Sequence, residues 1–375
     1  MRRSDFPELE QVYLDSACMS LRPRQVINKV NEYYNKYPVC PGRSNHSLSQ
    51  RADSELGKAR RSIARFIDAG PDELMLTSGT TESINTVARG FETGKVVLTD
   101  IEHNSDRIPW IESDADVVTL ETNDDFLSTL ESEVEEGDLV SMVHVSNLDG
   151  SELPVKEAAE IVHAKDAYIL VDGAQSVPHR EISVKDIGAD FFAFSGHKML
   201  GPSGTGGLYV SERARENLEP LKYGGGAVKD ATFDSSYRKG FPAGFEPGLP
   251  NIAGFIGLGE AARYLEDVGI KSIERHEKDL TERIYEELTE IDGVDNIGSK
   301  SPGVVSLRVG DLDPHRASLM FDQRGIALRS GMHCVHPWFH SKCKNATLRA
   351  SLYLYNDNQD VDRFISALKE IAVLG

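Results

Sequence analysis

Lys198 stands where the sequence changes abruptly from apolar to glycine-rich. Residues 191–194 are apolar and aromatic, and four glycines occur within the ten residues after the lysine. The apolar run is typical of a buried strand, and the glycines of a loop whose backbone passes close to another group. Burial there could keep the Lys198 amine neutral and nucleophilic, although a surface lysine on a glycine-rich hairpin has the same pattern.

A hydroxyl-rich loop at residues 78–82 lies between a short expected strand (73–77) and an expected helix (83–89). The free backbone N–H groups at the start of a helix bind anions such as phosphate, and Thr80 and Thr81 add hydroxyl donors. An ordinary helix N-cap with Glu82 in the first turn explains the same residues equally well.

Polar residues recur at the ends of the expected strands. Further apolar strands are expected at 95–100, 139–145, 167–171 and 207–210, with helix-compatible segments between them. This alternation predicts an α/β fold with a mostly parallel sheet flanked by helices. Strand ends of such a sheet meet at one edge, which favours a shared site. The residues at these ends are Thr81, His103, Asn147, Asp172, Gln175, His197 and Lys198.

An amine, a carboxylate and a hydroxyl-rich loop together suit pyridoxal phosphate (PLP). Lys198 would form a Schiff base with the aldehyde, and Asp172 would keep the pyridine nitrogen protonated, so that the ring withdraws electrons. His103 can stack on the ring, and Gln175 could bond its phenolic oxygen. Phosphate donors would come from Thr80, Thr81, Ser195 and His197.

Length and composition bound the remaining possibilities. A chain of 375 residues is expected to form two unequal domains, a large one over 15–255 and a small α+β one over 256–375 with 1–14. The net charge of −19 argues against nucleic-acid and anionic membrane partners. No signal peptide or apolar run of about 20 residues is evident. Four cysteines are expected to be reduced thiols, so we expect a cytoplasmic protein.

The chain resembles the class V, fold-type I PLP enzymes, specifically the SufS-like cysteine desulfurases. The matching motifs follow the family's order along nearly the whole chain, and the Arg-x-Gly-x-His-Cys motif ending at Cys334 distinguishes the desulfurases from relatives. The motifs lie at 78–82, 102–103, 145–147, 172–175, 195–198, 245–251, 329–334 and 349–356.

The resemblance implies a role for each matching residue. Lys198 holds PLP and moves the Cα proton, and Asn147 is a further cofactor or substrate contact. Arg349 holds the substrate carboxylate, with Arg329 as a weaker candidate. Cys334 takes the sulfur of L-cysteine as a persulfide, leaving alanine. The family also implies a homodimer and a sulfur acceptor or scaffold protein, in iron–sulfur cluster assembly or another sulfur pathway.

Three positions depart from the family pattern. Leu249 replaces a threonine expected to reach the phosphate of the partner subunit's PLP. Asn104 replaces the second histidine of a His-His pair, and Met332 stands where a histidine usually precedes His333. None of them removes a group that the mechanism requires.

Other functions remain open at this stage. A selenocysteine lyase, or a class V enzyme acting on another amino acid, would share the cofactor. A metal or sulfur-carrier module is the alternative from another class, because several possible ligands crowd into eleven residues. Their spacing matches no standard Cys/His site, so no metal is expected. These residues are His333, Cys334, His336, His340 and Cys343.

Overall fold

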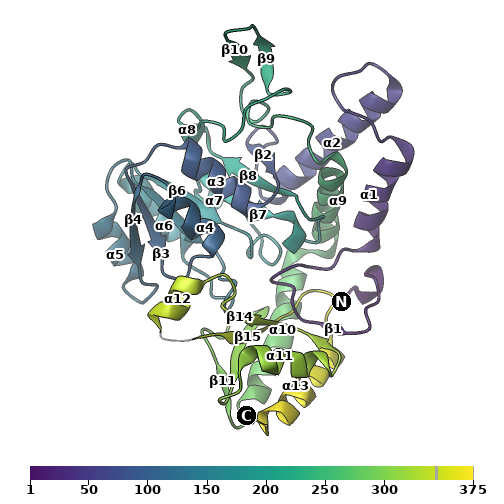
Figure 1. The fold of residues 1–375 in the computed structure, drawn as a ribbon, viewed down its shortest axis with the longest axis vertical. Coiled ribbons are helices and arrows are strands. Elements are labelled where there is room, and N and C mark those ends of the chain that lie inside the picture. Colours follow the sequence, from purple (N-terminus) through teal and green to yellow (C-terminus); the bar gives the residue numbers. More distant parts are fainter. Residues whose placement is uncertain (343–344, 375) are drawn as a thin grey trace.

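The computed structural model describes residues 1–342 and 345–374 and is built around a seven-stranded sheet (Figure 1). Its strand order is β2-β8-β7-β6-β5-β3-β4. Only β8 runs against the other six, so the expected mostly parallel α/β sheet is confirmed. The strands are β2 (Leu74–Thr77), β3 (Lys95–Thr99), β4 (Asp116–Leu120), β5 (Leu139–Val143), β6 (Tyr168–Asp172), β7 (Phe191–Ser195) and β8 (Gly206–Val210).

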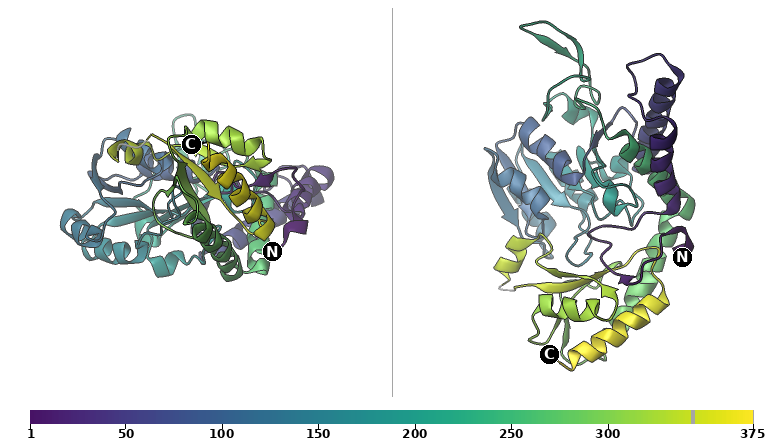
Figure 2. Two further views of the ribbon diagram at one scale, coloured as in Figure 1. Left: turned by 90° about the horizontal axis from the view of Figure 1, so that it is seen from below. Right: turned by 45° about the vertical axis from the view of Figure 1, so that its right-hand side comes forward.

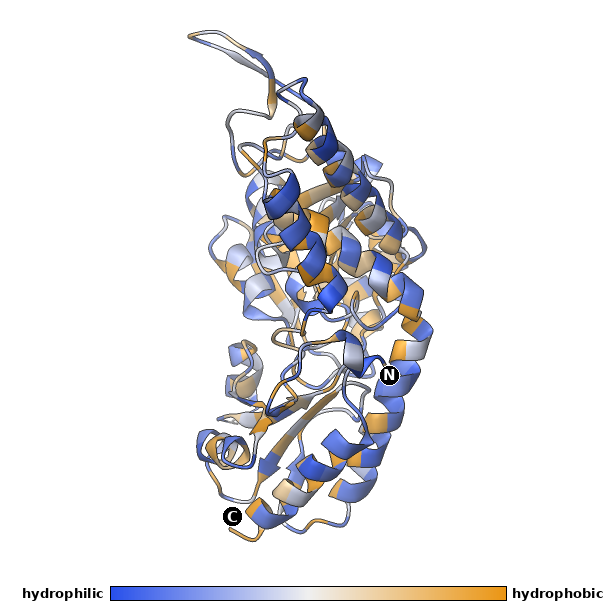
Figure 3. Cartoon of the chain, turned by 90° about the vertical axis from the view of Figure 1, so that its right-hand side faces the viewer, coloured by the Kyte–Doolittle hydropathy of each residue, from blue (hydrophilic) through white to orange (hydrophobic). Residues whose placement is uncertain are grey.

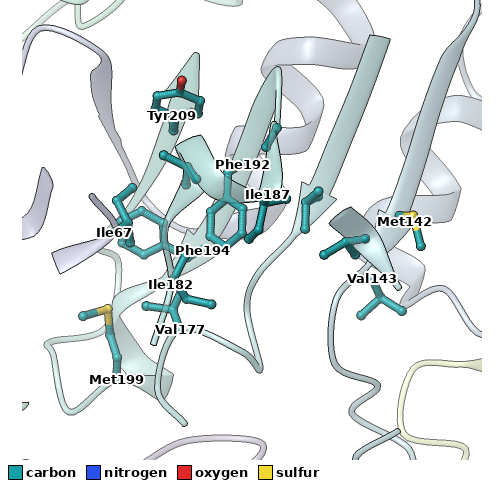
Figure 4. Close-up of a cluster of buried hydrophobic side chains, with 14 of the residues drawn as sticks. Ile67, Met142, Val143, Val177, Ile182, Ile187, Phe192, Phe194, Met199 and Tyr209 are labelled. Atoms are coloured by element: carbon teal, nitrogen blue, oxygen red, sulfur yellow. The ribbon is translucent and has the colours of Figure 1, made fainter. Parts of the chain in front are cut away.

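Both faces of this sheet are buried under helices. Successive side chains of a strand point to opposite faces, so Phe192 and Phe194 enter one hydrophobic cluster while Phe191 and Ala193 enter another. Figure 4 shows Phe192 and Phe194 among the buried side chains of the first cluster. That cluster contains residues of α2 (Ser47–Phe66), α5 (Phe126–Glu133), α6 (Val155–Ala164), α7 (Val184–Ile187) and α9 (Ile252–Val268). The second contains residues of α3 (Thr80–Gly90), α4 (Asn104–Ile111) and α8 (Glu212–Arg215).

Helix α9 packs against α2 and against α1 (Arg24–Lys36), and the three lie together beside the sheet (Figure 1). Figure 3 shows hydrophilic and hydrophobic residues alternating along the outer helices, as expected when one face is buried. Helix α2 begins at Ser47, directly after a polar segment. The His46 side chain caps it by accepting from the Ser49 backbone N–H at 3.1 Å.

A second, antiparallel sheet of order β11-β12-β15-β14 forms the other end of the molecule (Figure 2). It packs with α10, α11 and α13 around its own hydrophobic cluster, to which Val12 and Leu14 also belong. Strand β1 (Val12–Tyr13) pairs in parallel with β13 (Ile326–Ala327). The other elements are β11 (Val294–Asn296), β12 (Val304–Val309), β14 (Arg329–Gly331), β15 (Thr347–Ser351), α10 (Ile270–Leu288), α11 (Pro314–Asp322) and α13 (Asn358–Ala372). The two-domain boundaries stay a prediction.

The remaining elements are short. A hairpin of β9 (Val228–Ala231) and β10 (Ser236–Arg238) projects from the end opposite the second sheet (Figure 1). Helix α12 (His336–Ser341) is drawn below α4 in Figure 1. Two short 3-10 helices, η1 (Arg3–Asp5) and η2 (Gly196–Lys198), complete the described chain. Within residues 1–342 and 345–374, no helix combines the length and apolar composition needed to cross a membrane.

Gly206 has no space for a side chain, because a Cβ there would lie 2.4 Å from the Phe194 carbonyl oxygen and 2.6 Å from Gly79 Cα. Both neighbours are backbone atoms that cannot move aside. We predict that Gly206→Ala lowers the free energy of unfolding by about 1–3 kcal/mol, measured by urea denaturation. Gly94→Ala is the matched control, since a Cβ there meets nothing within 4 Å. Equal stability of the two variants would contradict the packing described.

Candidate active site

The expected strand-end residues converge on one cavity of about 240 Å³ at the carboxyl edge of the parallel strands. All predicted site residues except Cys334 line it. These lining residues are Thr80, Thr81, His103, Asn147, Asp172, Gln175, Ser195, His197, Lys198, Arg329 and Arg349. They come from both sheets and from the loops between them, so the cavity lies where the two parts of the fold meet.

Lys198 and Asp172 bring opposite charges into the cavity from neighbouring strands. Asp172 ends β6, and Lys198 follows β7 in η2. Burial lowers the pKa of the Lys198 amine, and the Asp172 carboxylate opposes this shift. Burial likewise raises the pKa of Asp172 to about 6, against the attraction of Lys198. One Asp172 oxygen accepts from the Ala174 backbone N–H at 2.8 Å.

The hydroxyl-rich loop forms a tight cradle at the start of α3. The Ser195 Oγ accepts from the Thr80 backbone N–H at 2.9 Å and lies 2.8 Å from the Thr80 hydroxyl. Gly79, with φ of +146°, lets the chain turn directly beside Ser195, where a Cβ would come within 3.1 Å of that hydroxyl. The Thr81 hydroxyl donates to Ser105 at 2.8 Å. Hydroxyl groups and the first turn of a helix thus face the cavity together.

His103 and Gln175 contribute ring and amide groups. The Nδ1 of His103 accepts from the Ser105 backbone N–H at 3.0 Å, which leaves the ring proton on Nε2. Burial, reinforced by the charge of Lys198, lowers the pKa of His103 to about 3, so the ring is neutral. The Gln175 amide donates to the Ala17 carbonyl at 2.7 Å, and its buried Oε1 has no hydrogen-bond partner in the described chain.

Arg349 is fully buried on β15 and joins three segments. One terminal nitrogen donates to the Asn147 carbonyl at 2.9 Å, and the other pairs with the Asp15 carboxylate at 3.1 Å. Its Nε is buried and has no partner among the residues described. Burial lowers the pKa of the guanidinium and raises that of Asp15. An arginine with a free N–H in a cavity is suited to hold a carboxylate.

Cys334 does not line the cavity but is linked to it through Arg329. The Nη2 of Arg329 lies 3.8 Å from the Cys334 Sγ, and Arg329 also lines the cavity. The loop is held in place because Asn104 donates its backbone N–H to the Cys334 carbonyl at 2.7 Å and Asn147 donates to the His333 carbonyl at 2.7 Å. His333 and Cys334 both have positive φ, of 49° and 61°, which is uncommon for residues with side chains.

Several cavity residues were not predicted as site residues. Cys18 and Ala17 come from the segment after β1, and His333 comes from the Cys334 loop. The His333 Nε2 lies 2.8 Å from the Thr347 hydroxyl, and burial lowers the pKa of its ring to about 2. His333 belongs to the sequence motif that ends at Cys334, so it could have been predicted as a site residue. Residues 17 and 18 belong to no such motif.

The metal alternative gains no support from the residues described. Across residues 1–342 and 345–374, no three His, Cys, Asp or Glu side chains gather where they could hold a metal ion. His333 is buried in the cavity wall, and the exposed His336 lies 2.8 Å from the Asn104 amide. Cys343, which that alternative also invoked, lies outside the described residues.

Pyridoxal phosphate fits the donor set of this cavity. Lys198 supplies the amine for the aldehyde, and Asp172 the buried carboxylate for the pyridine nitrogen. The unpartnered Oε1 of Gln175 is available to a ring hydroxyl. The hydroxyl pair of Thr80 and Ser195 retains one O–H that can donate to a phosphate at the start of α3. Each part of the cofactor therefore finds a group of the required chemistry.

The raised pKa of Asp172 makes a testable contribution to the stability of the cofactor-free protein. A carboxyl group that binds its proton more tightly when folded stabilises the fold at low pH. That stability is lost as the pH rises through its folded pKa of about 6. We predict that the free energy of unfolding of the parent falls by about 2–3 kcal/mol between about pH 4 and pH 8 because of this group. Asp172→Asn, which does not titrate, should lack this fall. Urea denaturation across this range measures it, and identical pH profiles for the variant and the parent would contradict the assignment.

The chain is similar to known proteins over nearly its whole length. The aminotransferase class-V family profile matches residues 12–364. A probable cysteine desulfurase of Halalkalibacterium halodurans is 40% identical, over 97% of this chain and 96% of that protein. One from Methanothermobacter thermautotrophicus is 39% identical, over 100% and 98%. The solved apo structure of a cysteine desulfurase from Thermococcus onnurineus has a TM-score of 0.95 and 37% identity, over 100% of this chain and 98% of that one. The chain therefore belongs to the class-V aminotransferase family.

Proposed function

We propose that this protein is a PLP-dependent cysteine desulfurase, which converts L-cysteine to L-alanine and holds the sulfur on Cys334. The observation that carries the proposal is the position of Cys334. Its thiol lies beside Arg329, which also lines the cavity that contains Lys198. The similar proteins named cysteine desulfurase support the same activity.

Arg349 is the group that we propose to bind the substrate carboxylate. Asp15 and the Asn147 carbonyl hold the Arg349 guanidinium in position. Its buried Nε has no partner among the described residues and can donate a hydrogen bond to the substrate. Arg329, at the same cavity, is a second cation within the site. Because a guanidinium binds a carboxylate with a defined geometry, Arg349 would also orient the Cα of the substrate.

Lys198 is the group that we propose to move the proton at the substrate Cα. Burial lowers the pKa of its amine, which favours the neutral base required for that transfer. Bound PLP supplies an electron sink that weakens the bonds at the substrate Cα. The neutral ring of His103, with its proton on Nε2, presents a hydrogen-bond donor to the same space.

Cys334 is the group that we propose to accept the sulfur. Its thiolate attacks the sulfur of the bound cysteine, the carbon–sulfur bond breaks and a sulfur–sulfur bond forms. The carbon fragment keeps the bonding electrons, takes up a proton and leaves as alanine. The adjacent Arg329 stabilises negative charge on the sulfur.

The sulfur then needs an acceptor. We propose an acceptor or scaffold protein of iron–sulfur cluster assembly or another sulfur pathway, which would receive it from the half-exposed Cys334. The three described cysteines, Cys18, Cys40 and Cys334, are free thiols, which supports a reducing compartment such as the cytoplasm.

Cys334→Ser tests this function directly. Serine is far less acidic and less nucleophilic than cysteine, so alanine formation from L-cysteine should fall at least about a hundredfold, while cofactor loading is retained. Amino-acid analysis measures the alanine. Cys40→Ser is the control, because the hydrogen bond described for the Cys40 thiol goes to the neighbouring Pro41 carbonyl and not to the active site. Undiminished turnover of L-cysteine would overturn the role of Cys334. Turnover of selenocysteine alone by the parent protein would favour a selenocysteine lyase.

We also propose that the protein is a C2 homodimer. Large apolar side chains are exposed around the β9–β10 hairpin and the 240–251 loop, as expected for a surface that another subunit covers. They include Tyr223, Phe233, Tyr237 and Leu249. Leu249, 66% exposed, occupies the position where the family pattern has a threonine.

Light scattering of the cofactor-loaded protein should give twice the mass of one chain. Leu249→Thr should remain dimeric and bind PLP with equal or higher affinity, because it restores a hydroxyl at the subunit boundary. A fully active monomer would refute a site shared between subunits.

A further inference from the structure

Two thiols share one guanidinium at the edge of the active-site cavity. The Nη1 of Arg329 donates to the Cys18 Sγ at 3.1 Å, and the Nη2 of the same group lies 3.8 Å from the Cys334 Sγ. Since a guanidinium is planar and compact, both sulfurs lie around a single small cation. The two cysteines are 316 positions apart in the sequence, at opposite ends of the chain.

Cys18 is fixed in this position by contacts on both sides. Its backbone N–H donates to the Asp15 carbonyl at 3.1 Å. The preceding Ala17 donates its N–H to the Ser351 hydroxyl at 2.9 Å and accepts from the Gln175 amide at 2.7 Å. Gln175 and Cys18 both line the cavity. The thiol is therefore held by the same groups that build the active site.

The environment of Cys18 differs from that of a cysteine that only fills space. Its side chain is half-buried, borders the cavity and receives a hydrogen bond from a charged donor. Cys40, by contrast, is half-buried outside the cavity, and its thiol contacts the neighbouring Pro41 carbonyl at 3.5 Å. A thiol that borders the cavity and lies beside Arg329 is placed to act as a nucleophile toward sulfur in the site.

We propose that Cys18 is a second sulfur-holding site, which receives the outer sulfur from the persulfide on Cys334. This inference rests on the proposed function, because Cys334 must first acquire that sulfur. In the transfer, the Cys18 thiolate attacks the outer sulfur of the Cys334 persulfide. A sulfur–sulfur bond forms at Cys18, the one at Cys334 breaks, and Cys334 leaves as a thiolate.

This step needs no oxidant or reductant, because one sulfur–sulfur bond replaces another. The attacking and the leaving sulfur both carry negative charge during the exchange. Arg329 donates to the first and lies beside the second, so its charge stabilises both ends of the transfer. The exchange also returns Cys334 to the thiolate form that the next substrate requires.

Sulfur-labelled L-cysteine tests the transfer. The cofactor-loaded protein is allowed about one turnover, its persulfides are trapped with iodoacetamide, and the peptides are analysed by mass spectrometry. We expect label on both the Cys18 and the Cys334 peptides. Cys18→Ala should carry label on Cys334 alone, with cyanide-releasable sulfur per subunit after excess substrate reduced about twofold. Cys40→Ala, the matched control, should behave like the parent.

The variants separate failure of this transfer from failure of the proposed function. Label on Cys334 alone in the parent would overturn the transfer and leave the desulfurase assignment intact. Label on neither peptide would overturn both. Label on Cys18 in Cys334→Ser would show that Cys18 takes sulfur from the substrate directly, against the proposed order. A Cys18–Cys334 disulfide with release of sulfide would contradict the transfer as well. Because the parent protein gives the first result by itself, the test survives if Cys18→Ala fails to fold.

Discussion

The opposite charges of Lys198 and Asp172 inside one buried cavity are the interaction on which the rest of the site depends. Burial disfavours the charged form of each group, lowering the pKa of Lys198 and raising that of Asp172, and each opposes the shift of the other. The sheet imposes this pairing, since β6 and β7 are parallel neighbours whose carboxyl ends meet at the same edge. A reactive amine thereby shares the cavity with a carboxylate suited to a cationic ring nitrogen.

Arg349 connects this pair to the second sheet. It is fully buried on β15, and its partners are Asp15 after β1 and the Asn147 carbonyl after β5. Arg349 is buried and Asp15 is half-buried, so loss of Asp15 would leave a buried charge without its ion-pair partner. These contacts join the N-terminal segment, the large sheet and the small sheet. Arg329 lies on the neighbouring strand β14, opposite Arg349, and is a second cation of the site. It contacts both Cys18 and Cys334.

The sequence predicted those parts of the fold and site that follow from periodicity and strand order. Parallel strands bring their ends to one edge, which is why the residue pattern alone predicts that Asp172 and Lys198 share a site. Strand β4 was missed because it is a partly exposed edge strand without a continuous apolar run. Asp15 and Cys18 were missed because they lie in an irregular segment whose position depends on pairing with β13 and β15, more than 300 residues away. Local patterns carry no information on such contacts.

The most direct test of the account is to identify the lysine that holds the cofactor. The purified, PLP-loaded protein is treated with borohydride, which fixes the cofactor covalently on its lysine, and the peptides are analysed by mass spectrometry. Lys198 shares its cavity with Asp172, which predicts the modification on Lys198, and Lys198→Ala should be colourless and unmodified. Modification of another lysine, or of the Lys198→Ala protein, would contradict the central claim.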